Sequence, residues 1–274
     1  MIDLRTTALT LLQVTEPDLK AERVRAVAAA ARPTGATAAL VEPRGGIPGR
    51  PLRPALLPHT ELKHRSVHSR DGHAALIHAL AHIELNAIDL ALDATWRFAD
   101  QPERFYRDWF GVAQEEALHF QLLHAHLKSL GFCYGDFPAH ASLWQMAERT
   151  RADLLARIAL VPRTLEARGL DASPPIRAKL AAIGDVRGAA IIDVILRDEI
   201  GHVALGNRWY RQFCEDRGLE PIQTFVDLAA QYDAPRQRGP FNLDARRAAG
   251  FDEAELAALQ AGSVRPAAAL TSAP

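Results

Sequence analysis

This chain of 274 residues has few cysteines, almost no net charge and no long uncharged apolar run. Its two cysteines, Cys133 and Cys214, are too few for the disulfide framework of a small secreted domain, and they fit a reducing compartment. The formal net charge of −1 gives no sign of a polyanionic partner. These absences exclude a disulfide-stapled module and argue against binding to nucleic acid through bulk charge.

The sequence also shows no apolar segment of the kind that crosses a membrane. No stretch of about 18 uncharged apolar residues occurs, and no charged segment followed by an apolar one opens the chain. The longest apolar stretch, residues 74–92, is interrupted by His78, His82, Glu84 and Asp89. We therefore expect a soluble cytoplasmic protein that is not inserted in a membrane.

The composition favours a helical protein with a sizeable core. Hydrophobic residues make up 48% of the sequence and charged residues 24%. We expect N-terminal helices and a Pro/Gly-rich extended arm in residues 1–70, and a four-helix bundle in residues 71–213. A helical tail, residues 214–274, should pack on the bundle. Whether this tail also closes a site on the bundle stays open at this point.

The extended arm is basic. Between residues 44 and 70 it carries six lysines and arginines against Glu61 alone. We interpret it as a solvated segment that wraps the bundle, with a nucleic-acid contact as the alternative.

The helix predicted from Asp185, as its N-cap, to Phe213 carries two polar residues on its apolar stripe. Glu199 and His202 are three residues apart, so they lie on one face of that helix. An unpaired carboxylate is costly to bury, so Glu199 needs a partner. A metal ion shared by the pair is one solution. A buried Glu–His hydrogen bond without metal is the other.

A second copy of the pair strengthens the metal hypothesis. Glu116 and His119 lie on the apolar stripe of a helix predicted between Pro102 and Gly131. The same spacing on the same kind of face predicts a second pair of ligands.

Two single glutamates stand in matching positions. Glu84 interrupts the apolar stripe of a helix predicted for residues 71–99, and it precedes Glu116 by 32 residues. Glu166 precedes Glu199 by 33 residues. The chain therefore resembles two helical hairpins in tandem, each with one glutamate on its first helix and Glu-x-x-His on its second.

The third helix of the bundle is expected over residues 142–168, with a kink at Pro162 one turn before Glu166. A separate short helix should begin at Pro174. Glu148 lies on the same stripe as Glu166 and is the alternative ligand. The two are 18 residues apart, about 27 Å along a helix, so one site cannot use both.

Two single glutamates and two Glu-x-x-His pairs from four helices make up the ligand set of carboxylate-bridged di-iron and di-manganese bundles. Four carboxylates balance the charge of two divalent cations, and no thiol is present, which favours iron or manganese over zinc. A polar core without metal is the alternative. We expect two Fe ions, or two Mn ions, per chain, held by Glu84, Glu116, His119, Glu166, Glu199 and His202.

Acidic neighbours of the ligands are candidates for orienting the histidines. Asp198 and Glu115 each precede a ligand glutamate. The alternative for each is an exposed or intrahelical ion pair. No catalytic residue is assigned from the sequence.

Six segments carry a resemblance to a known family: HALAHIELNAIDLALD, FYRDWFGVAQEEALHF, YGDFPAH, ALVPRTLEARGLD, ILRDEIGHVALGNRWY and RGPFN. They resemble a ferritin-like family known only as a domain of unknown function, over about residues 50–250. The resemblance implies a ferritin-like four-helix bundle with a di-metal site, and it carries over to the same six ligands. LEARGLD, around Glu166, is also similar to the third-helix segment of the di-iron tRNA hydroxylases that act on a prenylated adenosine.

Such a site implies an O₂-activating oxidase or oxygenase with an unknown small substrate or electron donor. Three alternatives remain: a ferroxidase or iron-handling protein, a tRNA-modifying hydroxylase that uses the basic arm, and a non-catalytic bundle stabilised by metal. A homodimer also stays open.

Overall fold

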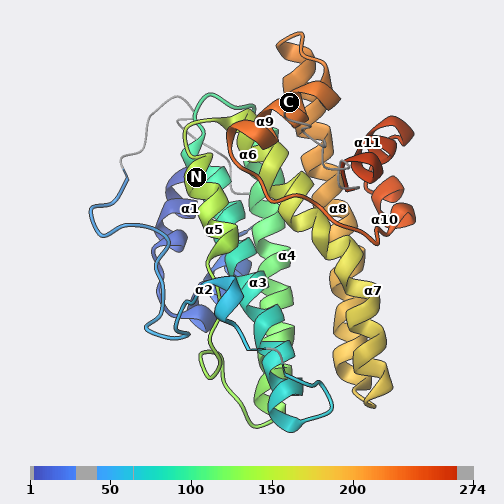
Figure 1. Cartoon of the computed structure of the whole chain (residues 1–274). Coiled ribbons are helices and arrows are strands. Elements are labelled where there is room, and N and C mark those ends of the chain that lie inside the picture. Colours follow the sequence, from blue (N-terminus) through green and yellow to red (C-terminus); the bar gives the residue numbers. More distant parts are fainter. Residues whose placement is uncertain (1–2, 29–41, 64, 264–274) are drawn as a thin grey trace, which may run out of the picture. The chain divides into compact units, whose positions relative to one another are not determined.

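The computed structural model describes residues 3–28, 42–63 and 65–263. Within them the regular structure is helical, and β-pairing is limited to an isolated bridge between Leu56 and Ala139. The protein is therefore all-α, as expected (Figure 1).

The chain divides into two compact units, and each is built from two stretches of sequence. Unit 1 comprises residues 1–151 and 175–195, and unit 2 comprises residues 152–174 and 196–274. The helices are α1 Leu4–Leu12, α2 Pro17–Ala26, η1 His59–Glu61, α3 Arg70–Arg97, α4 Glu103–Ser129, α5 Ser142–Arg149, α6 Leu154–Leu160, the π-helical segment η2 Val161–Glu166, α7 Ala167–Ala182, α8 Val186–Asp216, α9 Pro221–Gln231, α10 Leu243–Ala248 and α11 Glu253–Ser263. Helices α7 and α8 contribute to both units.

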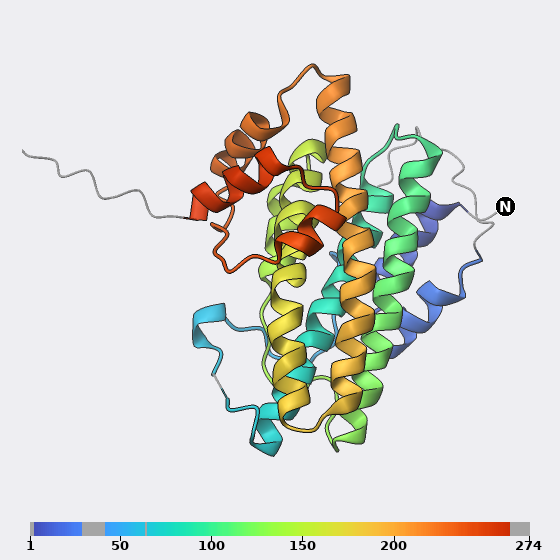
Figure 2. The same ribbon diagram turned by 90° about the vertical axis from the view of Figure 1, so that its right-hand side faces the viewer.

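The centre of unit 1 is the antiparallel pair α3 and α4 (Figures 1 and 2). Ser69 caps α3, because its hydroxyl oxygen accepts from the Gly72 backbone N–H at 3.1 Å. Gly131 lies just after the end of α4, and its φ of +84° suits glycine and lets the Phe132 N–H reach the Leu127 carbonyl. These local signals place both helix ends close to the predicted positions.

The N-terminal helices are attached to this pair by buried cations. Arg5 of α1 donates to the Trp96 carbonyl at 2.9 Å. Lys20 of α2 forms an ion pair with Asp89 of α3 at 2.5 Å, and both side chains are buried. Removal of either partner of the Lys20–Asp89 pair would leave an uncompensated buried charge, so the pair fixes where α2 packs.

The described part of the basic arm lies against the loop between α4 and α5. The Ala139 N–H donates to the Ala55 carbonyl at 3.0 Å. Arg65 and Arg70 stack over Phe137 and Phe132, with 5.3 Å and 5.1 Å to the ring centroids. Arginine stacked on an aromatic ring in this way covers apolar surface while its charge stays hydrated. Residues 33–41 and His64 of the arm lie outside the described residues.

Helix α3 is the element in the described residues that is long and apolar enough to cross a membrane. However, 72% of the apolar window in α3 is buried inside the protein. A core helix of a soluble protein has this pattern, and the structure is consistent with one.

Helices α7 and α8 run antiparallel and are joined by a tight turn (Figure 2). Gly184 follows the end of α7 with a φ of +80°, and the Asp185 N–H donates to the Leu180 carbonyl at 2.9 Å. The Asp185 side chain then accepts from the Gly188 N–H at 2.8 Å and caps α8, as predicted.

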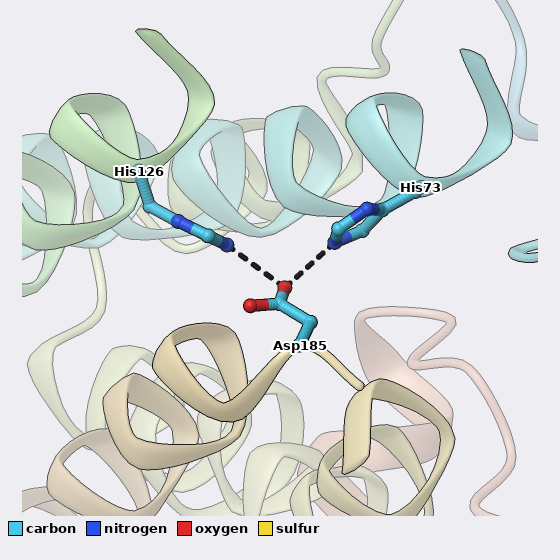
Figure 3. Close-up of side chains that lie close together, drawn as sticks. All are labelled: His73, His126 and Asp185. Carbon is cyan, nitrogen blue, oxygen red and sulfur yellow. Dashed lines mark hydrogen bonds and ion pairs between the residues drawn. The ribbon is translucent and has the colours of Figure 1, made fainter. Parts of the chain in front are cut away.

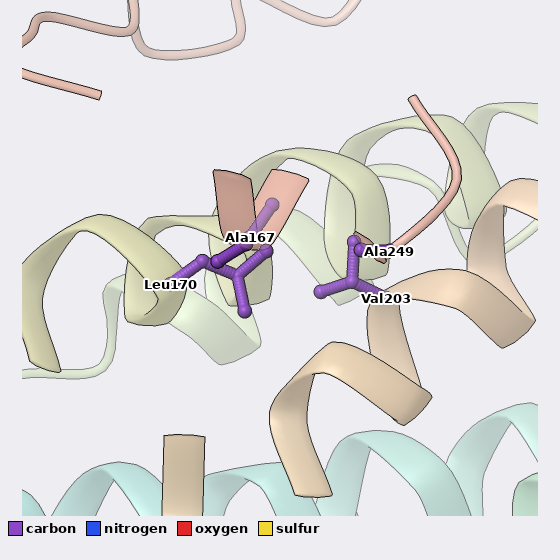
Figure 4. Packing of buried hydrophobic residues seen from close by; sticks show 5 residues of the cluster. Ala167, Leu170, Val203 and Ala249 are labelled. Carbon is purple, nitrogen blue, oxygen red and sulfur yellow. The ribbon is translucent and has the colours of Figure 1, made fainter. Parts of the chain in front are cut away.

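A small apolar core joins α7, α8 and α10 within unit 2. Ala167, Leu170, Val203 and Ala249 are buried together in it (Figure 4). Asn242, the last residue of the RGPFN segment, connects α10 to α7. Its side chain caps α10, and its Nδ2 donates to the Leu170 carbonyl at 3.2 Å. The tail therefore packs on the start of α7.

The prediction of one continuous third helix was wrong. The chain forms α5, a break at residues 150–153, then α6 and the π-helical segment, which contains Pro162. The π segment confirms a distortion at Pro162. Because of the break, the distance of 27 Å inferred between Glu148 and Glu166 does not apply.

The predicted helix start at Pro174 was also wrong, because α7 continues through Pro174 and Pro175. Proline has no N–H, so Pro174 leaves the Leu170 carbonyl without its helical donor. Asn242 supplies the missing donor from 72 residues away. A tertiary contact thus makes an interior proline tolerable there.

Candidate metal centre

Three of the predicted ligands meet in the core of unit 1. Glu84 lies in the middle of α3 and is 4% exposed, whereas Glu116 and His119 lie one turn apart on α4 and are fully buried. The apolar stripes that bury α3 and α4 against each other therefore carry these polar side chains into the interface between the two helices.

The geometry of this group suits a metal ion. Each residue offers a ligand atom, and these atoms lie within 4.8 Å of one another. His119 Nδ1 is 3.3 Å from Glu84 Oε2 and 3.4 Å from Glu116 Oε2. Two donors about 2.1 Å from one ion lie roughly 3 Å apart in octahedral geometry, so only a small adjustment is needed. Glu84, Glu116 and His119 could hold a metal ion.

The pKa values of Glu84 and His119 show how this group is protonated when no cation is bound. Burial raises the pKa of Glu84 well above its ordinary value, and the neighbouring charge of Glu116 raises it further. Burial by itself lowers the pKa of His119, but hydrogen bonds to Glu116 and Glu84 outweigh it and raise that pKa to about 11. The core thus compensates its carboxylates with protons, and a divalent cation is an alternative source of positive charge.

The second Glu-x-x-His pair lies in unit 2. Glu199 and His202 of α8 are 7% and 2% exposed, and His202 Nδ1 is 3.8 Å from Glu199 Oε1. The start of α7 approaches the pair, since a Cβ at Gly169 would lie 4.0 Å from Glu199 Cδ. Gly169 therefore allows ordinary contact between the α7 backbone and the carboxyl group.

Glu166 is the last residue of the π-helical segment in unit 2 and is half-buried. Pro162 starts the distortion, and the Thr164 hydroxyl donates to the Ala159 carbonyl five residues back, at 2.9 Å. A Cβ at Gly206 of α8 would lie 2.8 Å from Pro162 Cβ, so only glycine permits this approach. Short π-helical segments within α-helices frequently mark functional sites.

Three of the six predicted ligands thus belong to unit 1, and the other three belong to unit 2. Glu148, the alternative to Glu166, is exposed on α5, where its Oε1 accepts from Trp144 Nε1 at 2.9 Å. Of the two candidates for orienting the histidines, Glu115 is exposed. Asp198 forms an ion pair with the adjacent Arg197 at 2.8 Å.

A second group of potential ligands lies where three helix ends of unit 1 meet (Figure 3). His73 from the first turn of α3 and His126 from the last turn of α4 both point at Asp185. Their Nε2 atoms lie 2.6 Å and 2.8 Å from the same Asp185 Oδ2. These are hydrogen-bond distances, so each imidazole carries its proton on Nε2 and donates to the carboxylate. We describe the group as a hydrogen-bonded clasp between helix ends.

This clasp was not predicted from the sequence. Asp185 was recognised only as an N-cap, which uses one carboxylate oxygen and leaves the other available. His73 and Asp185 are 112 residues apart, and His126 and Asp185 are 59 apart. No local pattern links residues at such separations, although a histidine near the end of each long helix was a signal that could have been used.

Comparison with known proteins places the chain in a family. A family described as "Protein of unknown function (DUF455)" matches residues 13–257. An uncharacterized protein of Haemophilus influenzae is 46% identical over 223 residues, which cover 79% of this chain and 77% of that protein. No solved structure was found to match the chain. The resemblance to a family of unknown function is therefore confirmed, and the chain belongs to the DUF455 family.

Proposed function

We propose that this protein is a di-iron or di-manganese carboxylate protein that activates O₂ as an oxidase or oxygenase of a small substrate. The observation that carries the proposal is the burial of two Glu-x-x-His pairs, Glu116–His119 and Glu199–His202, in helical cores. A buried carboxylate needs a compensating charge, and a repeated pair calls for the same kind of partner twice.

The ligand set proposed for the two ions takes three residues from each predicted hairpin. Glu84, Glu116 and His119 come from the first hairpin, and Glu166, Glu199 and His202 come from the second. Their donors, four carboxylates and two imidazoles, suit iron or manganese. The clustering of Glu84, Glu116 and His119 within 4.8 Å supports the first half of this set.

A reduced pair of bound iron ions supplies the electrons with which O₂ is activated. In this proposal the side chains of the protein bind the ions and exclude water. Glu84 and His119 exchange their protons for the cation. Burial of Glu116 and His119, both fully enclosed, excludes water from that side of the site.

The proposal is tested by elemental analysis of protein purified without oxygen. We expect about two Fe or Mn per chain, and much less in Glu116→Ala and Glu199→Ala. Matched controls are Glu103→Ala on α4 and Asp193→Ala on α8, because both residues form exposed ion pairs. Occupancy by one zinc per chain would overturn the proposal, and so would an equal loss of metal in the controls.

Exposure of the reduced protein to O₂, followed in the near-UV and visible, separates the remaining functions. Oxidation of the metal coupled to a change in an added organic substrate supports the oxidase or oxygenase. Oxidation of Fe²⁺ alone, with release or storage of the product, would indicate a ferroxidase. A loaded protein that does not react with O₂ would be a metal-stabilised bundle.

A further inference from the structure

Unit 2 contains a cavity of about 530 Å³ that the proposed metal ligands do not line. Its walls come from the π-helical segment, α9, the chain around residues 234–237, α10 and α11. Cavities of a few hundred Å³ with mainly apolar walls and a few polar groups are typical binding sites for small molecules.

Helix α9 forms the apolar wall. Its residues Ile222, Phe225, Val226 and Ala229 follow the i, i+3, i+4, i+7 pattern of a buried stripe. All four line the cavity, and Val226 is 52% exposed. The stripe therefore faces a space that could hold an apolar molecule. From Ile222 to Ala229 it extends roughly 10 Å, about the length of an eight-carbon chain.

Arg246 of α10 gives the cavity a buried positive charge. Its side chain is fully buried, and its Nε and Nη2 donate to Asp171 at 3.1 Å and 2.6 Å. Within the described part of the chain, its Nη1 has no hydrogen-bond partner. A buried charged donor without an acceptor is costly, so an acceptor that enters the cavity would stabilise it.

A second buried guanidinium also lines the cavity. Arg163 of the π-helical segment hydrogen-bonds through Nε to Asn207 and through Nη2 to Glu255. Both carboxylate oxygens of Glu255 already accept hydrogen bonds, because the second oxygen accepts from Arg211 Nη2 and from the Asp252 N–H.

The cavity therefore has an excess of positive charge. Its lining contains three guanidiniums, those of Arg163, Arg236 and Arg246, against the single carboxylate of Glu255. Asp171 pairs with Arg246, and Glu255 pairs with both Arg163 and Arg211, so these three arginines share two carboxylates. An anionic group on the ligand would balance part of this charge, and arginine binds carboxylates well because its planar fork matches them.

We infer that the cavity binds a small amphipathic carboxylic acid, with its carboxylate at the guanidiniums of Arg163 and Arg246 and its apolar body along α9. The inference goes beyond the proposed function and does not depend on it, because binding involves no metal ligand and no turnover.

The test is isothermal titration calorimetry of the full chain with three probes that share one alkyl chain: octanoate, octan-1-ol and octylammonium. Octanoate should bind at least roughly ten-fold more tightly than octan-1-ol, since it adds a charge-assisted contact. Octylammonium should bind most weakly. Equal affinity for octanoate and octan-1-ol would overturn the inference, as would the absence of octanoate binding at millimolar concentration.

Two variants locate the site. Arg246→Lys keeps a positive charge opposite Asp171 but removes the Nη1 donor, and its affinity for octanoate should fall to that for octan-1-ol. Val226→Glu places a negative charge at the exposed edge of the cavity, and it should weaken octanoate binding at least ten-fold while the fold is kept.

The matched control is Val186→Glu, because Val186 is 77% exposed and does not line the cavity. Its affinity for octanoate should equal that of the unmodified chain. If Arg246→Lys fails to fold, the comparison of Val226→Glu with Val186→Glu decides. Equal affinities in these two variants would place the bound octanoate elsewhere and refute the inference.

Discussion

His119 Nδ1 of α4 lies 3.3 Å from Glu84 Oε2 of α3, so the imidazole of one Glu-x-x-His pair meets the single glutamate of the preceding helix. This contact is the structural counterpart of the spacing of 32 residues between Glu84 and Glu116. In the second hairpin, Glu166 and His202 have the corresponding places in the sequence.

Glu166 and Glu148 should differ in their effect on metal content. Glu166→Ala should lower the affinity for Fe²⁺ or Mn²⁺ by roughly ten-fold or more, because it removes a proposed ligand. Glu148→Ala should leave it unchanged, because Glu148 is exposed and bonded to Trp144. Metal titration under anaerobic conditions measures both. The opposite ranking would contradict the tandem arrangement of the hairpins.

Two glycines of α8 should respond differently to alanine. In Gly206→Ala the new Cβ would lie 2.8 Å from the rigid ring of Pro162, so we expect a loss of about 1–3 kcal/mol in the free energy of unfolding. Gly201 has open space around it, and Gly201→Ala should stabilise the helix by roughly 0.5–1 kcal/mol. Urea unfolding measures both. A neutral Gly206→Ala would show that α8 does not need this close approach.

His78 should make stability depend on pH. Its Nε2 accepts from the Gly135 N–H at 2.9 Å, which requires the neutral imidazole. Burial, together with the charges of His82 and His124 and against the opposing charge of Asp136, lowers the pKa of His78 to about 4. In the unfolded chain the His78 imidazole binds its proton near pH 6.5, so this group does not reduce the free energy of unfolding above that pH. As the pH falls toward 4, the unfolded chain takes up the proton and the folded chain does not, which lowers the free energy of unfolding by on the order of 3 kcal/mol.

The measurement for His78 is the free energy of unfolding between pH 7 and pH 4. His78→Gln removes the titrating group and should flatten the profile in that window. His68→Gln changes an exposed histidine and should leave the profile as it is. If His78→Gln and the unmodified chain have parallel profiles, the imidazole is not neutral in the folded protein.

Asp185 should stabilise the junction of three helix ends. Asp185→Ala removes the cap of α8 and the acceptor of His73 and His126, so we expect a loss of roughly 2–3 kcal/mol in unfolding experiments. Asp193→Ala on the same helix breaks only the exposed pair with Arg177 and should cost less than about 1 kcal/mol. If EDTA abolished the difference, or Zn²⁺ increased it, the junction would be a metal site and not a hydrogen-bonded clasp.

Much of the helical layout could be predicted because it depends on local signals. The apolar stripes of α3, α4 and α8 repeat at the helical period, and Asp185 and Gly131 mark helix ends through their own backbone and side-chain chemistry. The six candidate ligands were identified in the same way. A glutamate in an apolar stripe is conspicuous, and a repeated spacing of Glu and His needs no knowledge of distant contacts.

Only the tertiary structure decided the features that depend on residues far apart in the chain. Pro174 stays inside α7 because Asn242 supplies a donor to Leu170, and no local pattern encodes that contact. The break before α6 and the π-helical segment after it likewise replaced one expected helix. The contact of Glu84 with His119, the clasp at Asp185 and the burial of Arg246 all depend on how separate helices pack together. Helix period and capping are properties of neighbouring residues, whereas the burial and pairing of a charge depend on everything that surrounds it.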